Sequence, residues 1–241
     1  NVTPNPKHAV SIVGTRRPTE NGKDWCRRFV LELAQQVPEL TIISGLAYGI
    51  DVVAHKAAIE AGIPTLIIPA HGLDRIYPAL HRNVAVAALQ HGGILTEYPH
   101  LTEPERYNFV ARNRIIAGLA DAVVVVESKD KGGSLITAQM AQDYSRDVFA
   151  LPGRYNDETA AGCNRLIQQN RAQLITCATD LTRAMQWEQE TKLPKQTSIN
   201  ELLCNLSDNQ QILLQKLRES EDGWHINQLV IEMQLPYNTV A

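Results

Sequence analysis

The sequence predicts an α/β protein: a Rossmann-like, doubly wound and mostly parallel sheet, followed by a small partial winged-helix domain. Short β-branched runs alternate with amphipathic stretches of helix length, which is the rhythm of parallel βαβ units. Four consecutive valines at 123–126 are apolar on both faces of a strand, as a sheet covered by helices on both sides requires. A hydrophobic content of 44% over 241 residues is enough for one large packed domain and a small one.

The strands and crossover helices follow from two periodicities. Runs rich in β-branched residues predict six strands, at residues 9–13, 41–44, 65–68, 93–96, 122–126 and 148–151. Between them, apolar residues recur at a spacing of three to four, which predicts helices at 23–36, 52–61, 83–90, 109–119 and 135–144.

A second domain is expected near the C-terminus. A helix running from residue 176 to about 189 completes a Rossmann-like domain over 1–189, and the polar stretch 190–200, which contains Pro194, is typical of a linker. The apolar positions of 201–241 predict a helix, a turn and a second helix, as in the first half of a winged helix-turn-helix. Residues 236–241 contain no Lys or Arg, so a protein contact is as well supported there as DNA binding.

Charge and cysteine usage limit the functional classes. The net charge of −3 argues against indiscriminate nucleic-acid binding, so a basic site must be local. The four cysteines, Cys26, Cys163, Cys177 and Cys204, fit neither a metal pair nor a disulfide framework and are expected to be free thiols. Asp51 and His55 share a helix face, but two ligands make a weak metal site, and none is predicted.

The chain has no apolar run of membrane-spanning length and no secretory signal pattern, which indicates a cytoplasmic protein without a membrane partner. It begins with Asn1 and stops at Ala241 in mid-pattern, so we treat it as a fragment.

Three glycine-rich turns follow predicted strands. In a parallel sheet such turns open on the same edge, so they are expected to share one crevice. Each offers free backbone N–H groups at a helix N-terminus, which favours an anion such as phosphate, although glycines that merely make tight turns give the same pattern. The candidate residues in these turns are Gly14, Thr15, Arg16 and Arg17, then Ser44 and Gly45, then Gly133 and Ser134.

A cluster of arginines with an aromatic residue is the second candidate feature. Arginine forks combined with an aromatic ring and an amide are suited to contact a single-stranded backbone and to stack on its bases. The candidate residues are Phe109, Arg112, Asn113 and Arg114, with Arg82 as a further cation. The alternative is a solvated helix start in which Arg112 and Arg114 pair with Glu103 or Glu105.

Several enzyme signatures are absent. No G-x-G-x-x-G follows the first predicted strand, and there is no phosphate loop of the G-x-x-x-x-G-K-[ST] type. Ser44 lies in a turn that lacks the G-x-S-x-G elbow of a hydrolase. A dinucleotide oxidoreductase, an ATPase or a serine hydrolase therefore has little support.

From about Val10 to Ile175 the chain resembles the DNA-processing protein A (DprA/Smf) family. The motifs that carry the resemblance are VGTRRPT, IISGLAYGIDVVAHKAA, GLDRIYPALHR, LTEYP, FVARNRIIAGLADAVVVVES, GGSLITAQMA and DVFALPGR, all in that family's order. The sequence departs from the family at Val110, where Pro is usual, and at Gly132, where Ser is usual.

This resemblance implies a protein that binds and protects incoming single-stranded DNA during natural transformation. It further implies a homodimer that helps to load the RecA recombinase in place of single-strand-binding protein, with no cofactor and no catalysis. The implied DNA-binding residues are Arg16, Ser44, Gly45, Arg82, Phe109, Arg112, Asn113, Arg114, Gly133 and Ser134. The implied dimer region is about 160–175, with Leu166 and Ile167 as candidate interface residues, although a place in the buried core is the stronger explanation for both.

The main alternative is an enzyme of the nucleotide phosphoribohydrolase type on a similar fold. Aligning Gly132 and Gly133 with the paired glycines of that signature places Gln139 where the enzymes have Glu. Cleavage of a glycosidic bond needs a carboxylate, which an amide cannot replace. Glu97 and Glu127 end strands near the crevice, and we expect them to be helix-cap or arginine partners. A transcription regulator and a nucleotide-sensing module are further alternatives.

Overall fold

The computed structural model describes residues 6–187, 208–218 and 224–233. The chain divides into two units, Asn1–Gln189 and Glu190–Ala241, which are treated separately below. The linker expected at 190–200 lies outside the described residues.

The first unit is built on one seven-stranded sheet in the order β4-β3-β2-β1-β5-β6-β7, and every neighbouring pair is parallel. The prediction of a doubly wound α/β fold is therefore confirmed. The strands are β1 (His8–Gly14), β2 (Leu40–Ser44), β3 (Thr65–Ile67), β4 (Gly93–Ile94), β5 (Ala122–Val126), β6 (Asp147–Ala150) and β7 (Gln173–Leu174).

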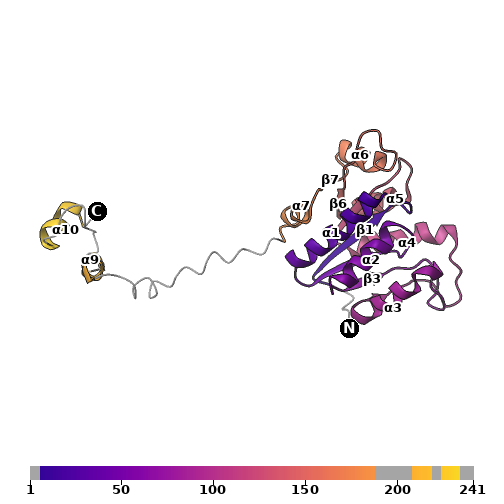
Figure 1. Ribbon diagram of the computed structural model, residues 1–241, viewed down its shortest axis with the longest axis horizontal. Helices are drawn as coiled ribbons and strands as arrows, with labels where there is room; N and C mark the ends of the chain where they lie inside the picture. Colours follow the sequence, from indigo (N-terminus) through magenta and orange to yellow (C-terminus); the bar gives the residue numbers. More distant parts are fainter. Residues whose placement is uncertain (1–5, 188–207, 219–223, 234–241) are drawn as a thin grey trace. The chain divides into compact units, whose positions relative to one another are not determined.

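Helices cover both faces of this sheet (Figure 1). One layer holds α1 (Glu20–Gln36), α2 (Ile50–Glu60), α3 (Arg82–His91), which follows the short 3₁₀ helix η1 (Ala79–His81), and α7 (Ala178–Ala184). The other layer holds α4 (Arg106–Leu119), α5 (Gly133–Asp143) and α6 (Ala161–Gln168). The winding direction reverses between β1 and β5, because β1 leads outward through β2 to β4 and β5 leads outward through β6 to β7.

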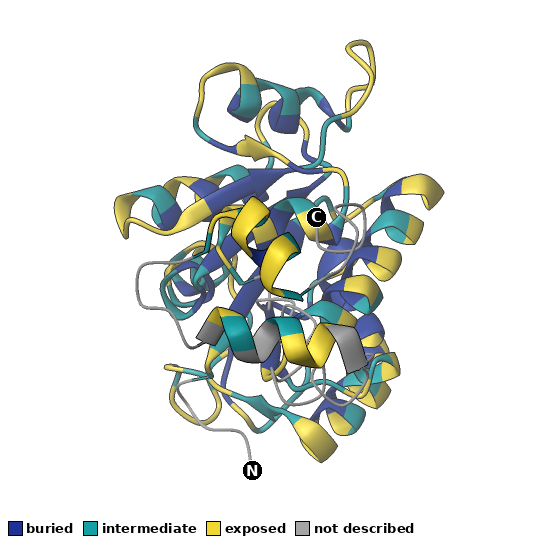
Figure 2. Cartoon of the chain, turned by 90° about the vertical axis from the view of Figure 1, so that its left-hand side faces the viewer, coloured by how far each residue is buried: buried dark blue, intermediate teal, exposed yellow. Residues whose placement is uncertain are grey.

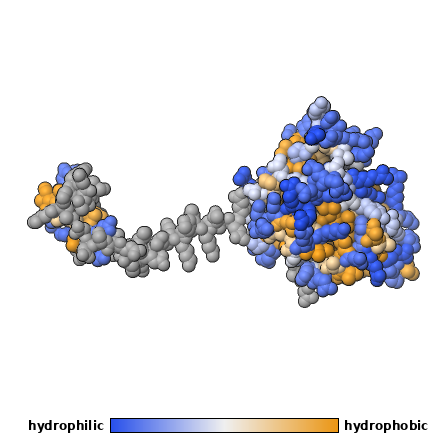
Figure 3. Space-filling view, viewed as in Figure 1, coloured by the Kyte–Doolittle hydropathy of each residue, from blue (hydrophilic) through white to orange (hydrophobic). Residues whose placement is uncertain are grey.

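The hydrophobic core forms two layers because successive strand residues point to opposite faces. On β5, Val124 and Val126 belong to the cluster beneath α1, α2 and α7, whereas Val123 and Val125 belong to the cluster beneath α4, α5 and α6. Figure 2 shows the result: buried strands at the centre, and helices that are buried only on their inner sides. In Figure 3, hydrophobic residues also gather at the surface around α2 and α3, where Leu80, Val86 and Leu89 are exposed.

Two elements of the first unit were not predicted: α6, and the two-residue edge strand β7, whose residues are both exposed. Three predicted elements are shorter than expected. Strand β4 ends at Ile94, strand β3 ends at Ile67, and the helix predicted from residue 176 to about 189 is observed only as Ala178–Ala184.

The second unit contains two described helices, α9 (Asp208–Arg218) and α10 (Ile226–Met233), at the positions predicted for a helix-turn-helix. Trp224 in the turn donates its indole N–H to the carbonyl of Lys216 at 3.0 Å, and Lys216 pairs with Glu232 at 3.1 Å. The third helix of a winged domain would fall in 236–241, outside the described residues.

Three of the four cysteines lie among the described residues, and all three are free thiols. Cys26 and Cys163 are free and buried, and Cys177 is free and half-buried; Cys204 lies outside the described residues. Burial raises the pKa of the Cys163 thiol to about 12 and the pKa of Cys26 further still. None of the helices described here is both long and apolar enough to cross a membrane.

Candidate nucleic-acid interface

A pocket of about 670 Å³ opens at the carboxyl ends of β1 and β5, where the winding direction reverses. This is the position at which open parallel sheets bind ligands. Of the residues predicted for the site, the structure brings eight together in its lining: Gly14, Thr15, Arg16, Phe109, Arg112, Asn113, Gly133 and Ser134.

The turn after β1 forms one wall of the pocket. Gly14 lies so close to the Val126 carbonyl and to Ile50 that a Cβ atom would clash with both. The following Thr15 donates its N–H to the carbonyl of Glu127 at 2.8 Å, which ties this turn to the end of β5. The Glu127 carboxylate accepts the N–H of Thr19, the N-cap of α1, at 2.8 Å. Glu127 is thus a helix-cap partner, as expected.

The turn that begins α5 forms the opposite wall. Gly132 is the N-cap, so the first backbone N–H groups of α5 lack partners within the helix and are free to face an anion. The Ser134 side chain is buried and donates its hydroxyl to Ser128 at 2.9 Å. The anion-binding capacity of this wall therefore lies in the backbone rather than in the serine hydroxyl.

Three exposed cations surround the pocket: Arg16, Arg106 and Lys131. None has a carboxylate partner among the residues that the structure describes. The guanidinium of Arg16 lies over the Phe109 ring, 5.2 Å from its centroid. A fourth cation of the lining, Lys129, is neutralised by Glu158 at 2.7 Å.

Arg112 is the floor of the pocket rather than part of its rim. It is only 3% exposed, and its Nη1 donates hydrogen bonds to the carbonyl of Gly45, at 3.0 Å, and to that of Ile68. These carbonyls follow β2 and β3, so one side chain joins the ends of two strands. Burial lowers the pKa of Arg112 to about 10.

Asp51 is the carboxylate next to this arginine. Burial raises the pKa of Asp51, while Arg112 and the backbone N–H groups of Gly45 and Ala47 lower it. The N–H of Ala47 lies 3.4 Å from its Oδ2. Among the described residues of the lining, Asp51 carries the one carboxylate. It is buried, and backbone N–H groups of the protein interact with it.

The remaining predicted site residues are not brought into the lining. Arg114 lies on another side of α4 and pairs with Glu97, rather than with Glu103 or Glu105. Ser44 is buried and donates its hydroxyl to the Ile12 carbonyl at 2.6 Å. Gly45 packs directly against the Arg112 guanidinium. Arg17 and Arg82 are exposed outside the lining, next to the turn after β1 and at the start of α3.

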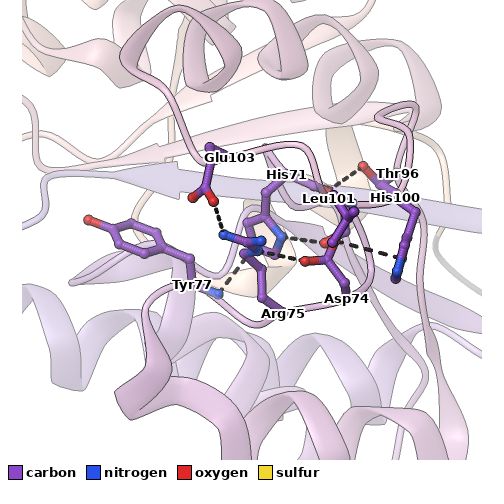
Figure 4. Close-up of polar contacts among 9 residues, drawn as sticks. His71, Asp74, Arg75, Tyr77, Thr96, His100, Leu101 and Glu103 are labelled. Atoms are coloured by element: carbon purple, nitrogen blue, oxygen red, sulfur yellow. Dashed lines mark hydrogen bonds and ion pairs between the residues drawn. The ribbon is translucent and has the colours of Figure 1, made fainter.

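A polar network fixes the segment that leads into α4 (Figure 4). Arg75, in the loop after β3, donates to Asp74 at 2.7 Å and also pairs with Glu103. Asp74 in turn accepts the backbone N–H of Leu101 at 2.7 Å. Because Glu103 lies three residues before Arg106, the first residue of α4, this network holds the segment that leads to Arg106 and Phe109.

The network also includes a histidine with a defined hydrogen-bonding pattern. His71 is buried, its Nε2 accepts the backbone N–H of Tyr77 at 3.1 Å, and its Nδ1 lies 2.8 Å from the Gly72 carbonyl (Figure 4). The proton is therefore on Nδ1. The tilted ring of Tyr77 lies 5.8 Å from that of Phe109, which connects this loop to the pocket wall.

The two candidate interface residues differ in accessibility. Leu166 is 4% exposed and packs in the core beneath α5 and α6, so its side chain is not presented to a partner. Ile167 is half-buried and borders a second surface hollow, together with Leu174 of the edge strand.

Arg106 and Lys131 were not among the predicted site residues. Arg106 is the first residue of α4 and Lys131 directly precedes Gly132, the N-cap of α5, so their position relative to a predicted helix N-terminus was the available signal.

The chain is similar to known proteins named Smf or DNA processing protein A. The chain is 44% identical over 176 residues to protein Smf of Synechocystis, covering 73% of this chain and 44% of the relative. The structure of DNA processing protein A from Streptococcus pneumoniae matches with 38% identity and a TM-score of 0.67, over 73% of this chain and 61% of that one. A structure of DNA processing protein A from Helicobacter pylori, which concerns the single-stranded-DNA binding mode of that protein, also matches this chain. The identity is 32% and the TM-score is 0.67, over 76% of this chain and 82% of that one.

The chain spans about half the length of the curated relatives that it matches. The model of one family, DNA recombination-mediator protein A, matches residues 1–186, which include every described residue of the first unit except Trp187. The chain belongs to the DNA recombination-mediator protein A family.

Proposed function

We propose that this protein binds single-stranded DNA in the pocket between β1 and β5. One observation carries the proposal: three unpaired cations, an aromatic ring and the free N–H groups of a helix start converge on one pocket. These are the groups that bind phosphate and stack on bases. The match to the Helicobacter pylori protein, whose structure concerns single-stranded DNA, supports the same ligand.

In the proposed mode, phosphates bind Arg16, Arg106 and Lys131 and the backbone N–H groups at the start of α5. A base stacks on Phe109 or on Tyr107. Because Arg16 covers the Phe109 ring, its guanidinium moves to a phosphate as the base takes its place in the proposed mode. Asn113, which also borders the pocket, is available to hydrogen-bond to a base edge.

We further propose that DNA is held without turnover. The carboxylate in the described lining, Asp51, is buried and held by backbone N–H groups, and Glu97 and Glu127 are occupied by Arg114 and by the α1 cap. A general acid or base that could reach a bound strand is therefore not provided by these groups.

Membership of the family supports a finer role. We propose that the protein protects incoming DNA in the cytoplasm during natural transformation and helps to load the RecA recombinase in exchange for single-strand-binding protein. Homodimerisation is proposed through the surface near Ile167 and Leu174, where half-buried and exposed apolar side chains border a hollow.

The test is fluorescence anisotropy with a labelled oligothymidylate and its duplex, across a salt series. We expect the single strand to bind more tightly than the duplex, because stacking requires accessible bases. Arg16→Ala and Arg106→Ala should each weaken binding and reduce the slope of log K against log salt by about 0.7, the value for one lost phosphate contact on a single strand.

Arg114→Ala is the matched control, because Arg114 lies on the same helix but is paired with Glu97 outside the pocket. It should leave both affinity and slope close to those of the wild type. Equal binding of duplex and single strand, or equal effects of Arg106→Ala and Arg114→Ala, would overturn the proposed site.

A further inference from the structure

Two Arg–Tyr dipeptides lie near the carboxyl edge of the sheet, one at the pocket wall and one in the loop after β6. Arg106 and Tyr107 begin α4, and Tyr107 is 77% exposed. Arg154 and Tyr155 lie in the loop between β6 and α6, and Tyr155 is 96% exposed, the highest value among the large hydrophobic residues that the structure describes. Exposing an aromatic ring so fully costs hydrophobic free energy, so the ring is available to a partner.

The loop that carries Tyr155 is held in place by its own hydrogen bonds. The side-chain amide of Asn164 on α6 binds Gly153 twice, accepting its N–H at 3.1 Å and donating to its carbonyl at 3.0 Å. Asp157 closes a turn by donating its backbone N–H to the carbonyl of Arg154 at 3.1 Å. The exposed ring is thus presented on a structured loop, which appears beside α6 at the top of Figure 1.

This loop is also fastened to the pocket wall. The backbone N–H of Gly162 donates to the Ser128 carbonyl at 2.8 Å, and Lys129 pairs with Glu158 at 2.7 Å. Ser128 and Lys129 both line the pocket. Asp130, the next residue, is bound by Arg165 of α6 at 2.7 Å.

The strand order places these features in a row. Along the carboxyl edge of the sheet, the loop after β3 contacts the start of α4 through Tyr77 and Phe109, the pocket lies at β1 and β5, and the Tyr155 loop follows β6. Arg106 itself lines the pocket, and the second Arg–Tyr pair follows β6, the strand next to β5 on the same edge.

We propose that the bound strand extends beyond the pocket onto the β6–α6 loop, where Tyr155 stacks on a base and Arg154 contacts the adjacent phosphate. This inference rests on the proposed function and enlarges its site from one pocket to a track along the sheet edge. The charge of Asp157 in the same loop opposes that of Arg154, so stacking rather than charge dominates this contact.

The experiment measures affinity against strand length. Wild type, Tyr155→Ala and Tyr155→Phe are titrated with labelled oligothymidylates of about four and about 16 nucleotides, which bracket the usual site sizes of single-strand binders. We expect Tyr155→Ala to weaken binding of the long strand by at least about fivefold, with an unchanged salt slope and unchanged binding of the short strand. Tyr155→Phe should bind as the wild type, because stacking does not need the hydroxyl group.

Tyr144→Ala is the control for loss of a tyrosine. Tyr144 is 47% exposed but lies at the C-terminal end of α5, at the other edge of the sheet from the pocket, and should not affect either strand. Thermal unfolding of each variant confirms that it is folded.

The outcomes separate the two proposals. If wild type binds both strands and Tyr155→Ala is indistinguishable from it on the long strand, the extended track is wrong and the pocket stands. If wild type binds neither strand, the proposed function itself fails.

Discussion

Two groups of arginine and carboxylate support the pocket, and they differ chiefly in burial. Arg112 and Asp51 form its floor, and both are almost completely buried. Arg75, Asp74 and Glu103 hold the segment before α4 at the surface (Figure 4). The pKa shifts differ accordingly: burial raises the pKa of Asp51, whereas the hydrogen bond from Arg75 lowers that of Asp74 to about 2.

The comparison shows that the same pair of chemical groups serves two purposes. Buried charges are expensive to desolvate and are tolerated only while each one has its partners, so the floor is a point of high energetic sensitivity. In the surface network the side chains of Arg75 and Glu103 are 34% and 63% exposed, so water solvates this pair whether or not the two groups meet, and the pair mainly fixes geometry. Four predictions test this difference.

The largest effect is expected for Arg112→Gln. This change removes the charge that favours the Asp51 carboxylate, and it removes the hydrogen bonds to the carbonyls of Gly45 and Ile68. Leaving a buried polar group without its partner costs about 1–3 kcal/mol for each group, and two carbonyls lose theirs here. Urea denaturation measures it, with Arg114→Gln as the exposed control on the same helix. Equal losses for the two variants would show that burial does not make the difference.

A smaller effect is expected for Gly45→Ala, which keeps every charge. A Cβ at this position would lie within 2.6 Å of the Cζ atom of Arg112, so the guanidinium must shift from its carbonyl partners. Such overpacking costs about 1–3 kcal/mol. Gly133→Ala is the matched control in the same pocket, because a Cβ there meets nothing within 4 Å. Urea denaturation of both variants decides the point: similar stabilities would contradict a tightly packed floor.

The pH dependence of stability should have opposite signs in the two regions. The pKa of Asp74 is lowered from 3.8 to about 2 in the folded state, so its contribution is complete above pH 3.8 and is lost as the pH falls toward 2. The pKa of Asp51 is raised, so protonation relieves the cost of burying its charge as the pH falls.

Melting temperatures measured between about pH 6 and pH 2 test this contrast. Asp74→Asn should lose less stability on acidification than the wild type, because the group that is titrated has been removed. Asp51→Asn should lose at least as much stability on acidification as the wild type does. Parallel curves for all three proteins would contradict the assignment of opposite pKa shifts.

Much of the fold was predictable because its signals are local. The valines of β5 are apolar on both faces, and that pattern identifies a central parallel strand without any tertiary information. Strand β7 has no such signal: Gln173 and Leu174 are exposed and pair only with Phe149 and Ala150 of β6. Its formation depends on a neighbouring edge rather than on its own residues.

The site was predictable only in part, for a geometric reason. The turns after β1 and β5 meet because a parallel sheet places them on one edge. Arg112 and Arg114 cannot share that edge, because residues two apart on a helix point to different sides. Arg112 therefore enters the floor and Arg114 pairs with Glu97. Which of the two faces inward depends on the packing of α4, and helix periodicity alone leaves that choice open.

The smallest effect is expected for Glu103→Gln in the surface network. This change removes one charge from the contact with Arg75, but the Glu103 side chain is largely exposed and Arg75 keeps its bond to Asp74. Water and the Asp74 carboxylate replace the contact that Arg75 loses, so the melting temperature should stay within measurement error of the wild type. Differential scanning calorimetry of Glu103→Gln beside Arg112→Gln makes the comparison direct. A loss at Glu103 as large as that at Arg112 would mean that the network before α4 carries fold stability, and that burial is not what separates the two regions.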